Sequence, residues 1–226
     1  ASTLMVGRVE TPSTWLLTRR IFLRLMGFIY VAAFLSFGHQ AHGLIGSQGI
    51  RPSGVFMQAV SEHGTWWQFP TLQWLGGDSM LTATWITGVI AACMLILGII
   101  PLCSAILCWG MYLSLVTVGS VFMQYQWDAL LLEAGVLAIL WCPLTWRLNS
   151  ARARRPSRLV HWLVVILLAR LLFFAALVKV QSGDASWADG TALSFYFWTQ
   201  PLPWWPAWIV ASLPHWMLWI GCMLMF

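Results

Sequence analysis

The sequence predicts an all-α, polytopic transmembrane helical bundle of about six spans. Hydrophobic residues make up 60% of the 226 residues and charged residues only 8%, whereas a soluble domain carries about 25% charged residues. The apolar residues gather in six stretches of roughly 20 residues, the length that crosses a bilayer core as a helix. Seventeen tryptophans fit aromatic belts at the membrane interfaces. The lipid bilayer is therefore an expected partner.

The six expected spans follow one another with short polar or proline-containing breaks. In order they are Ile21 to Phe37, Met80 to Ile100, Leu102 to Met123, Trp127 to Trp146, Leu159 to Val180 and Trp205 to Phe226. Residues 1–20 are expected to form an N-terminal segment in the cytoplasm. Residues 21–226 are expected to form a single transmembrane domain.

Basic residues predict the orientation of these spans, because Arg and Lys accumulate on the cytoplasmic side. Arg8, Arg19 and Arg20 precede the first span. A second group lies in the loop 147–158 and consists of Arg147, Arg152, Arg154, Arg155 and Arg158. Six spans place both groups in the cytoplasm and leave only Arg51 as a basic residue in the exterior loops 38–79 and 181–204. The orientation of the spans in the membrane thus explains the basic residues of the loop 147–158, and no nucleic-acid partner is expected.

The two exterior loops combine turn residues with tryptophan. Their Gly and Pro content predicts turns, and the apolar remainder predicts short helices that lie on the membrane surface or cap the bundle. Gly43 and Gly46 argue against a helix around His39 and His42, and no metal or cofactor site is expected there. The candidate client-contact residues of these loops are Trp66, Trp67, Phe69, Trp74 and Trp187.

Ionisable residues inside the spans form the candidate site, because such residues are costly in a membrane and need partners. Arg170 follows Arg158 by twelve residues, about 18 Å along a helix. Glu133 lies five residues beyond Asp128 on the preceding span, at a similar depth, which predicts a Glu133–Arg170 pair. Lys179, the one lysine of the sequence, lies nine residues further out, near the depth of Asp128.

Two interpretations of these charges stay open. One is a structural ladder of ion pairs that fixes the register of two spans. The other is a catalytic site that opens to the exterior, with Lys179 as the base and Glu133, Asp128 and Arg170 around it. Other chemistry has little support, since the sequence contains no G-x-S-x-G, H-E-x-x-H or Walker motif. The cysteines are Cys93, Cys103, Cys108, Cys142 and Cys222, and all are expected to be small buried hydrophobes.

Four short signatures, in chain order, resemble the membrane domain of the lipase maturation factor family. The first is Arg20-Ile-Phe-Leu-Arg24, followed by Ile29-Tyr30. The second comprises Gly43-Leu-Ile-Gly46, Gly49-Ile-Arg-Pro52, Pro70-Thr-Leu72 and Trp74. The third is Gln126-Trp-Asp-Ala-Leu-Leu-Leu-Glu133. The fourth comprises Arg170-Leu-Leu-Phe173, Val178-Lys179, Ser182-Gly-Asp184, Trp187, Thr191-Ala-Leu193 and Thr199-Gln-Pro-Leu-Pro203.

The resemblance implies a membrane-embedded assembly or maturation factor that acts on a client at the exterior face. Eukaryotic members of the family are endoplasmic-reticulum proteins with chaperone-like activity toward secreted lipases. The composition here, rich in Trp and with Arg over Lys, favours a bacterial plasma (inner) membrane. The family often has His and Glu before the Thr-Gln-Pro-Leu-Pro segment, whereas this chain has Phe195 to Trp198, which puts any activity of those residues in doubt.

Two further interpretations compete with the maturation factor. A more distant resemblance links the chain to the membrane domain of vitamin K-dependent gamma-carboxylase, where a lysine base precedes an acidic and Trp-containing stretch. Lys179 with Asp184, Trp187 and Asp189 is similar in placement, which keeps open a membrane enzyme that acts on a lipid or a membrane-bound substrate. The other alternative is an accessory subunit of a larger membrane complex.

Overall fold

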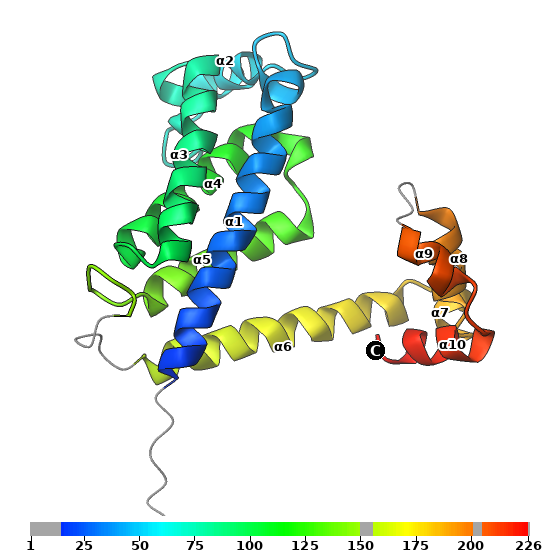
Figure 1. The fold of residues 1–226 in the computed structure, drawn as a ribbon. Helices are drawn as coiled ribbons and strands as arrows, with labels where there is room; N and C mark the ends of the chain where they lie inside the picture. The colour runs from blue at the N-terminus through cyan, green and yellow to red at the C-terminus, as the bar shows by residue number, and fades with distance from the viewer. Residues whose placement is uncertain (1–14, 150–155, 201–204, 226) are drawn as a thin grey trace, which may run out of the picture. The chain divides into compact units, whose positions relative to one another are not determined.

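The structure is a computed structural model, and it describes residues 15–149, 156–200 and 205–225. These residues form helices joined by short connections (Figure 1). Within them, β-structure is limited to an isolated antiparallel bridge between Ile99 and Arg147. The chain divides into two compact units, residues 1–164 and residues 165–226. The expected all-α class is confirmed.

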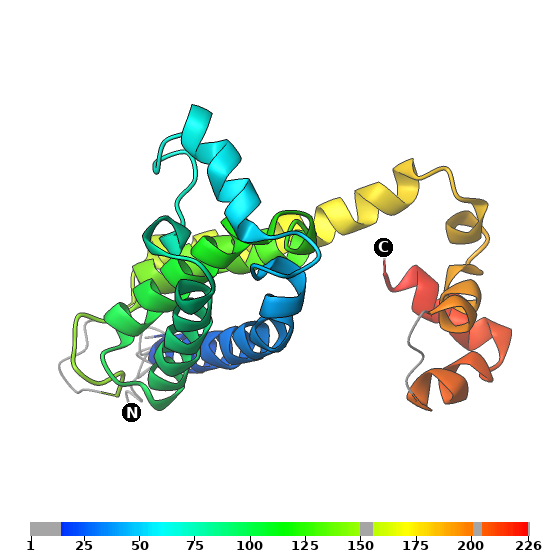
Figure 2. The ribbon, with the colours of Figure 1, turned by 90° about the horizontal axis from the view of Figure 1, so that it is seen from above.

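The first unit is built on long helices that lie side by side. In chain order its elements are α1 (Leu16–Ile45), α2 (Ser53–His63), η1 (Leu72–Leu75), α3 (Asp78–Leu97), α4 (Pro101–Gly119), η2 (Ser120–Phe122), α5 (Gln126–Trp141) and the start of α6 (Arg158–Gln181). Helix α3 packs between α1 and α4, and α5 packs against α4. The short α2 runs across one end of these helices rather than along them (Figures 1 and 2).

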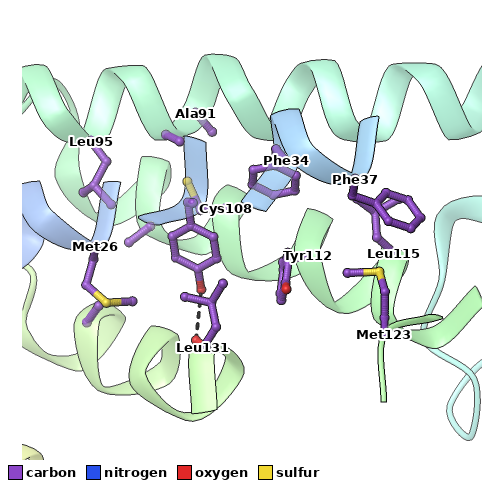
Figure 3. Packing of buried hydrophobic residues seen from close by; sticks show 14 of the residues in the cluster. Met26, Phe34, Phe37, Ala91, Leu95, Cys108, Tyr112, Leu115, Met123 and Leu131 are labelled. Atoms are coloured by element: carbon purple, nitrogen blue, oxygen red, sulfur yellow. Dashed lines mark hydrogen bonds between the residues drawn. The ribbon is translucent and has the colours of Figure 1, made fainter. Parts of the chain in front are cut away.

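One face of α1 supplies the centre of the first unit. Its buried hydrophobic residues recur every three or four positions, as one face of a helix requires, and are Leu23, Met26, Tyr30, Phe34, Phe37, Ala41 and Ile45. Figure 3 shows Phe34 and Phe37 beside Tyr112 and Leu115 of α4. The opposite face of α1 is also apolar and exposed, at Leu17, Ile21, Leu25 and Phe28. A helix that is apolar all round is typical of a membrane span.

A tight connection joins α3 to α4, and residues 146–148 are hydrogen-bonded to this connection. Gly98 ends α3 with φ of 72°, a left-handed conformation that glycine adopts without strain. A Cβ added to Gly98 would also lie 2.8 Å from the Leu148 Cβ. The Leu148 N–H donates to the Gly98 carbonyl at 2.9 Å, and the Ile100 N–H donates to the Trp146 carbonyl at 2.9 Å. Residues 146–148 therefore lie at the α3–α4 end of the unit.

Within the described residues, four helices are long and apolar enough to cross a membrane. They are Leu16–Ile45, Asp78–Leu97, Pro101–Phe122 and Arg158–Gln181. These helices correspond to the first, second, third and fifth expected spans, so the chain is an integral membrane protein. The fourth expected span is shorter than predicted. Helix α5 has 16 residues, or about 24 Å, which is less than the about 30 Å of a bilayer core. It ends at Trp141, two residues before Pro143, which cannot continue a helix.

The end of the first span was predicted wrongly. Helix α1 continues beyond Phe37 to Ile45, so His39, His42 and Gly43 are helical. The glycine costs about 1 kcal/mol in a helix interior. The buried stripe continues through Ala41 and Ile45, and this tertiary packing outweighs the local propensity.

The described residues of the second unit form the remainder of α6 and four short helices. These are α7 (Ala185–Ala188), α8 (Ala192–Thr199), α9 (Trp205–Ala211) and α10 (His215–Met223). Short helices, α2, α7 and α8 among them, lie in both regions expected to be exterior loops, and their place at the membrane surface stays a prediction. The sixth expected span is not one continuous helix, because residues 212–214 interrupt it and Pro214 precedes α10. A small buried cluster of Ala192, Leu193, Leu218 and Cys222 holds α8 and α10 together.

Candidate functional site

Asp128 is a buried carboxylate at the start of α5. Its side chain is 4% exposed. The Tyr112 hydroxyl donates to its Oδ1 at 2.6 Å, and the Tyr125 N–H donates to its Oδ2 at 3.2 Å. The Tyr112 ring packs edge-on against Tyr30 and Phe34, at centroid distances of 5.9 Å and 5.8 Å. Asp128 thus ties the first turn of α5 to the centre of α4, which is a structural role.

Glu133 and Arg170 fall in different units. Glu133 lies on the exposed side of α5 in the first unit, and Arg170 lies on an exposed side of α6 in the second. The expected Glu133–Arg170 pair would join the two units, and it stays a prediction. The four candidate catalytic residues are therefore divided, with Asp128 and Glu133 in one unit and Arg170 and Lys179 in the other.

Lys179 connects three segments of the second unit. It lies in the last turn of α6. Its ammonium donates to the Met225 carbonyl and lies 5.2 Å from the centroid of the Trp187 ring. A carbonyl oxygen and the face of an indole ring are both partners of a cation. The structure brings together Lys179 and Trp187, as the sequence placed them, in contacts that suit a structural tie.

Asp184 is the N-terminal cap of α7. Its Oδ1 accepts a hydrogen bond from the Ser186 N–H at 2.9 Å, the geometry of an N-cap. That N–H, and after it the Ser186 hydroxyl, hold the pKa of the Asp184 carboxyl below its ordinary value of 3.8. Asp189 follows α7 as its C-terminal cap and is exposed. These two carboxylates shape the turn around Trp187.

The candidate client-contact residues of the first unit form two groups. Trp66 and Trp67 stack on each other at 4.5 Å and are 63% and 77% exposed. Phe69 is half-buried and packs edge-on against Phe56 of α2 at 5.9 Å. The Trp74 indole donates to the Phe69 carbonyl at 3.0 Å. Phe69 and Trp74 thus hold the segment in place, while Trp66 and Trp67 are its outward-facing surface.

Two hydrogen-bonded anchors fix this aromatic segment on the bundle. The Leu72 N–H donates to the Ser114 hydroxyl at 2.8 Å, and the Thr71 hydroxyl donates to the Ser114 carbonyl at 3.1 Å. Nearby, the Ser47 N–H and hydroxyl both donate to the Asp78 carboxylate, at 2.8 Å and 2.6 Å. The loop after α1 and the segment before α3 are therefore held to the ends of the long helices.

Sequence reasoning missed Tyr112 and Tyr125. Tyr112 lies within the apolar run of the third expected span, where a buried tyrosine hydroxyl usually needs an acceptor, and that requirement was the available signal. Tyr125 stacks on Trp127 at 4.5 Å, and both rings are more than half exposed. The cysteines also differ from expectation, because Cys93 and Cys103 are exposed on apolar helices. Among the described residues, no group of three His, Cys, Asp or Glu side chains could hold a metal ion.

Known proteins are similar to this sequence over most of its length. The family model of the lipase maturation factor transmembrane domain matches residues 17–226. The chain belongs to the lipase maturation factor family. Human lipase maturation factor 1 is 36% identical over 210 residues, which cover 87% of this chain and 36% of that protein. Lipase maturation factor 2 of Gallus gallus is 38% identical over 216 residues, which cover 88% of this chain and 29% of that protein.

A third relative agrees, and all of them are longer than this chain. Human lipase maturation factor 2 is 36% identical over 224 residues, which cover 89% of this chain and 31% of that protein. The chain thus spans about a third of the length of the curated relatives it matches. No solved structure matches it.

Residues of the signatures that resemble the lipase maturation factor family lie at helix ends and turns of the structure. Asp128 of the third signature caps α5. In the second signature, a Cβ on Gly49 would lie 2.9 Å from the His42 carbonyl oxygen. In the fourth, Asp184 caps α7 and Lys179 contacts Trp187. In this chain these residues therefore stabilise helix ends and turns.

Proposed function

We propose that this chain is the membrane domain of a maturation factor that assists the folding or assembly of a lipase-like client at the exterior face of the membrane. The match of residues 17–226 to the family carries the proposal, because the relatives are named for lipase maturation. The mode of action is chaperone-like binding. The localisation is a bacterial plasma membrane, or the endoplasmic reticulum if the chain is eukaryotic.

The stacked pair Trp66–Trp67 supports a binding role for the segment 64–75. Large aromatic side chains on a fixed backbone are the usual anchors of protein recognition, because they bury much apolar area at a small entropy cost. Both rings are more than 60% exposed, while the backbone on either side is held by α2 and by Ser114. Such a surface presents apolar contact area without rearrangement, which suits a client that exposes apolar segments before it is folded.

The geometry of the first unit supports the orientation in this proposal. The Trp15 and His161 rings stack at 4.2 Å, so the starts of α1 and α6 lie at one end of the unit. Residues 146–148 lie at the α3–α4 turn, whereas the segment 64–75 precedes the start of α3. Arg147, which lies within residues 146–148, and the Trp66–Trp67 pair are thus at opposite ends of α3. Under the positive-inside rule, this arrangement supports an aromatic segment on the side away from the cytoplasm.

The decisive test measures client maturation directly. The chain is co-produced with a lipase in cells that lack their own maturation factor, and the active lipase per amount of lipase antigen is measured. Trp66→Ser with Trp67→Ser is expected to lower this ratio severalfold at unchanged abundance of the membrane protein. Trp146→Ser is the matched control, because Trp146 is equally exposed, at 79%, and lies at the other end of α3. Full maturation by the double variant would remove this surface from the proposal.

A second candidate function, an accessory subunit of a larger membrane complex, is favoured by α6. At its start, within the first unit, the apolar side chains of Leu159 and Trp162 are 68% and 59% exposed. Two observations together would favour this function. The chain would co-purify with a complex at fixed stoichiometry in mild detergent, and α6 variants would lose the complex but keep lipase activity. The enzyme with Lys179 as its base gains no support from the contacts of that ammonium.

A further inference from the structure

Helix α10 lies beside the end of α6 within the second unit. The Lys179 ammonium, in the last turn of α6, donates to the carbonyl of Met225, which follows the end of α10. A Cβ added to Gly190, shortly after α6, would collide with the Trp219 ring in the middle of α10. The buried cluster that joins α8 to α10 adds a third contact. These contacts come from different parts of α10, so the whole helix is held near the place where α6 ends.

The contact between Lys179 and Met225 bears on which membrane face the chain reaches after α6. Helix α6, from Arg158 to Gln181, is long and apolar enough to cross a bilayer, so a crossing α6 has its two ends at opposite faces. A segment that crossed back after α6 would finish near Arg158, about 30 Å along the helix from Lys179. Met225 instead contacts Lys179. The contact therefore argues that the chain is at the same face at Gln181 and at Met225.

The lengths of the last three helices agree with this argument. Helices α8, α9 and α10 have 8, 7 and 9 residues, so the longest reaches about 14 Å, less than half of a bilayer core of about 30 Å. Ser212 and Pro214, in the break between α9 and α10, are exposed. Irregular backbone does not face lipid inside the hydrocarbon core, because its polar groups would lack partners there. The break therefore suits a position nearer to water.

The side chains of these helices suit the boundary between lipid headgroups and acyl chains. The sequence after Asp189 contains no Asp, Glu, Lys or Arg. Each of the three helices presents a strongly exposed tryptophan, namely Trp198 at 68%, Trp208 at 64% and Trp216 at 62%. Indole rings concentrate at the level of the headgroups, where one end of the ring is apolar and the other wet. A surface that is uncharged, apolar and rich in indole therefore fits a lipid interface better than bulk water.

We propose that α8, α9 and α10 lie in the lipid interface of the membrane face at which α6 ends, and that the chain returns to that face at Met225 without a further crossing. The partner of the exposed aromatic surface is the headgroup and upper acyl region of that leaflet, which the unit reaches because α6 carries it there. The Lys179 ammonium stays at the same level, as a lysine at the end of a span does. The inference is independent of the proposed function, because it rests on the second unit alone.

The first test labels introduced cysteines of the full chain with a membrane-impermeant maleimide, before and after the membrane is permeabilised. Gln181→Cys and Leu224→Cys flank the segment, and Ser157→Cys, an exposed position just before α6, is the matched control for the opposite face. The unsubstituted chain gives the background of its own cysteines. We expect Gln181→Cys and Leu224→Cys to react under the same condition and Ser157→Cys under the other. Reaction of Leu224→Cys together with Ser157→Cys would overturn the proposal, as would one condition for all three.

The second test measures depth and identifies the partner. A fluorophore on Trp216→Cys is quenched in vesicles of phosphatidylcholine brominated either near the headgroup or near the chain ends. Leu172→Cys is the matched control, because Leu172 is also 62% exposed but lies near the middle of α6. We expect headgroup-proximal bromine to quench Trp216→Cys severalfold more strongly, and the reverse for Leu172→Cys. Stronger quenching of Trp216→Cys by bromine near the chain ends would overturn the interfacial position. Quenching by aqueous iodide alone would overturn lipid as the partner.

Discussion

The Tyr112 hydroxyl donates a hydrogen bond of 2.6 Å to Oδ1 of Asp128, and both side chains are buried. The contact joins the middle of α4 to the first turn of α5, two helices separated by a short connection. A buried carboxylate is costly unless its oxygens accept hydrogen bonds, and the Tyr125 N–H serves the second oxygen. Asp128, a candidate for catalysis by its sequence, therefore acts in the structure as an anchor for α5.

Tyr112→Phe should destabilise the protein without a direct effect on function. The substitution removes one donor from the buried Asp128 carboxylate, and we expect a loss of about 1–3 kcal/mol. The thermal unfolding midpoint in detergent checks this. Tyr125→Phe is the matched control, since the Tyr125 ring is 51% exposed and the N–H that donates to the Asp128 carboxylate belongs to the backbone, which the substitution keeps. Similar midpoints for the two variants would contradict the anchoring role.

Gly135→Ala should be far more harmful than Gly110→Ala, although both glycines lie within helices. A Cβ at Gly135 would collide with the Tyr30 hydroxyl and lie 2.8 Å from the Trp109 Cδ1, whereas a Cβ at Gly110 would meet nothing within 4 Å. Overpacking of this kind costs about 1–3 kcal/mol, while Ala in an open helical position is neutral or stabilising. The amount of monodisperse protein recovered after heating measures the difference, and equal recovery would refute the close packing of α1 on α5.

The sequence predicted the helices better than their ends. Apolar runs of spanning length located four spans, because length and hydropathy are local properties. The extension of α1 to Ile45 depends on the packing of Ala41 and Ile45 against other helices, which no local pattern reveals. The break before α10 was predictable, since Pro214 lies in the middle of the expected sixth span.

The candidate site was predictable only where its residues are close in sequence. Lys179 and Trp187 lie eight positions apart on one helix end and the following turn, and the structure brings them together. Tyr112 and Asp128 meet because α4 and α5 pack against each other, and the register of that packing fixes the contact. The exposure of Trp66 and the partial burial of Phe69 likewise depend on how α2 packs, not on their shared aromatic character.

Lys179→Gln should loosen the second unit, and Lys179→Arg should restore most of the loss. The ammonium joins the end of α6 to the Met225 carbonyl and to the Trp187 ring, and a guanidinium can make both kinds of contact. Hydrogen exchange of α10 measures the effect. A double-mutant cycle with Trp187→Leu should give a coupling of about 0.5–1 kcal/mol. Loss of lipase maturation in Lys179→Arg, with unchanged exchange, would instead restore the base role of Lys179.

The start of α7 should open as the pH falls below about 4. Hydrogen bonds from Ser186 hold the pKa of the folded Asp184 carboxyl below its ordinary value of 3.8. The cap is therefore fully present above that value, and its contribution is lost as the pH falls from 3.8 through the lower folded pKa. Asp184→Asn keeps an acceptor at the cap without a titrating group, so its amide exchange at residues 186–191 should show no such step. Amide exchange measured at pH 6 and pH 3, each relative to this variant, checks the prediction. A wild-type protein that matches Asp184→Asn at both pH values would show that the carboxylate charge does not stabilise the turn that holds Trp187.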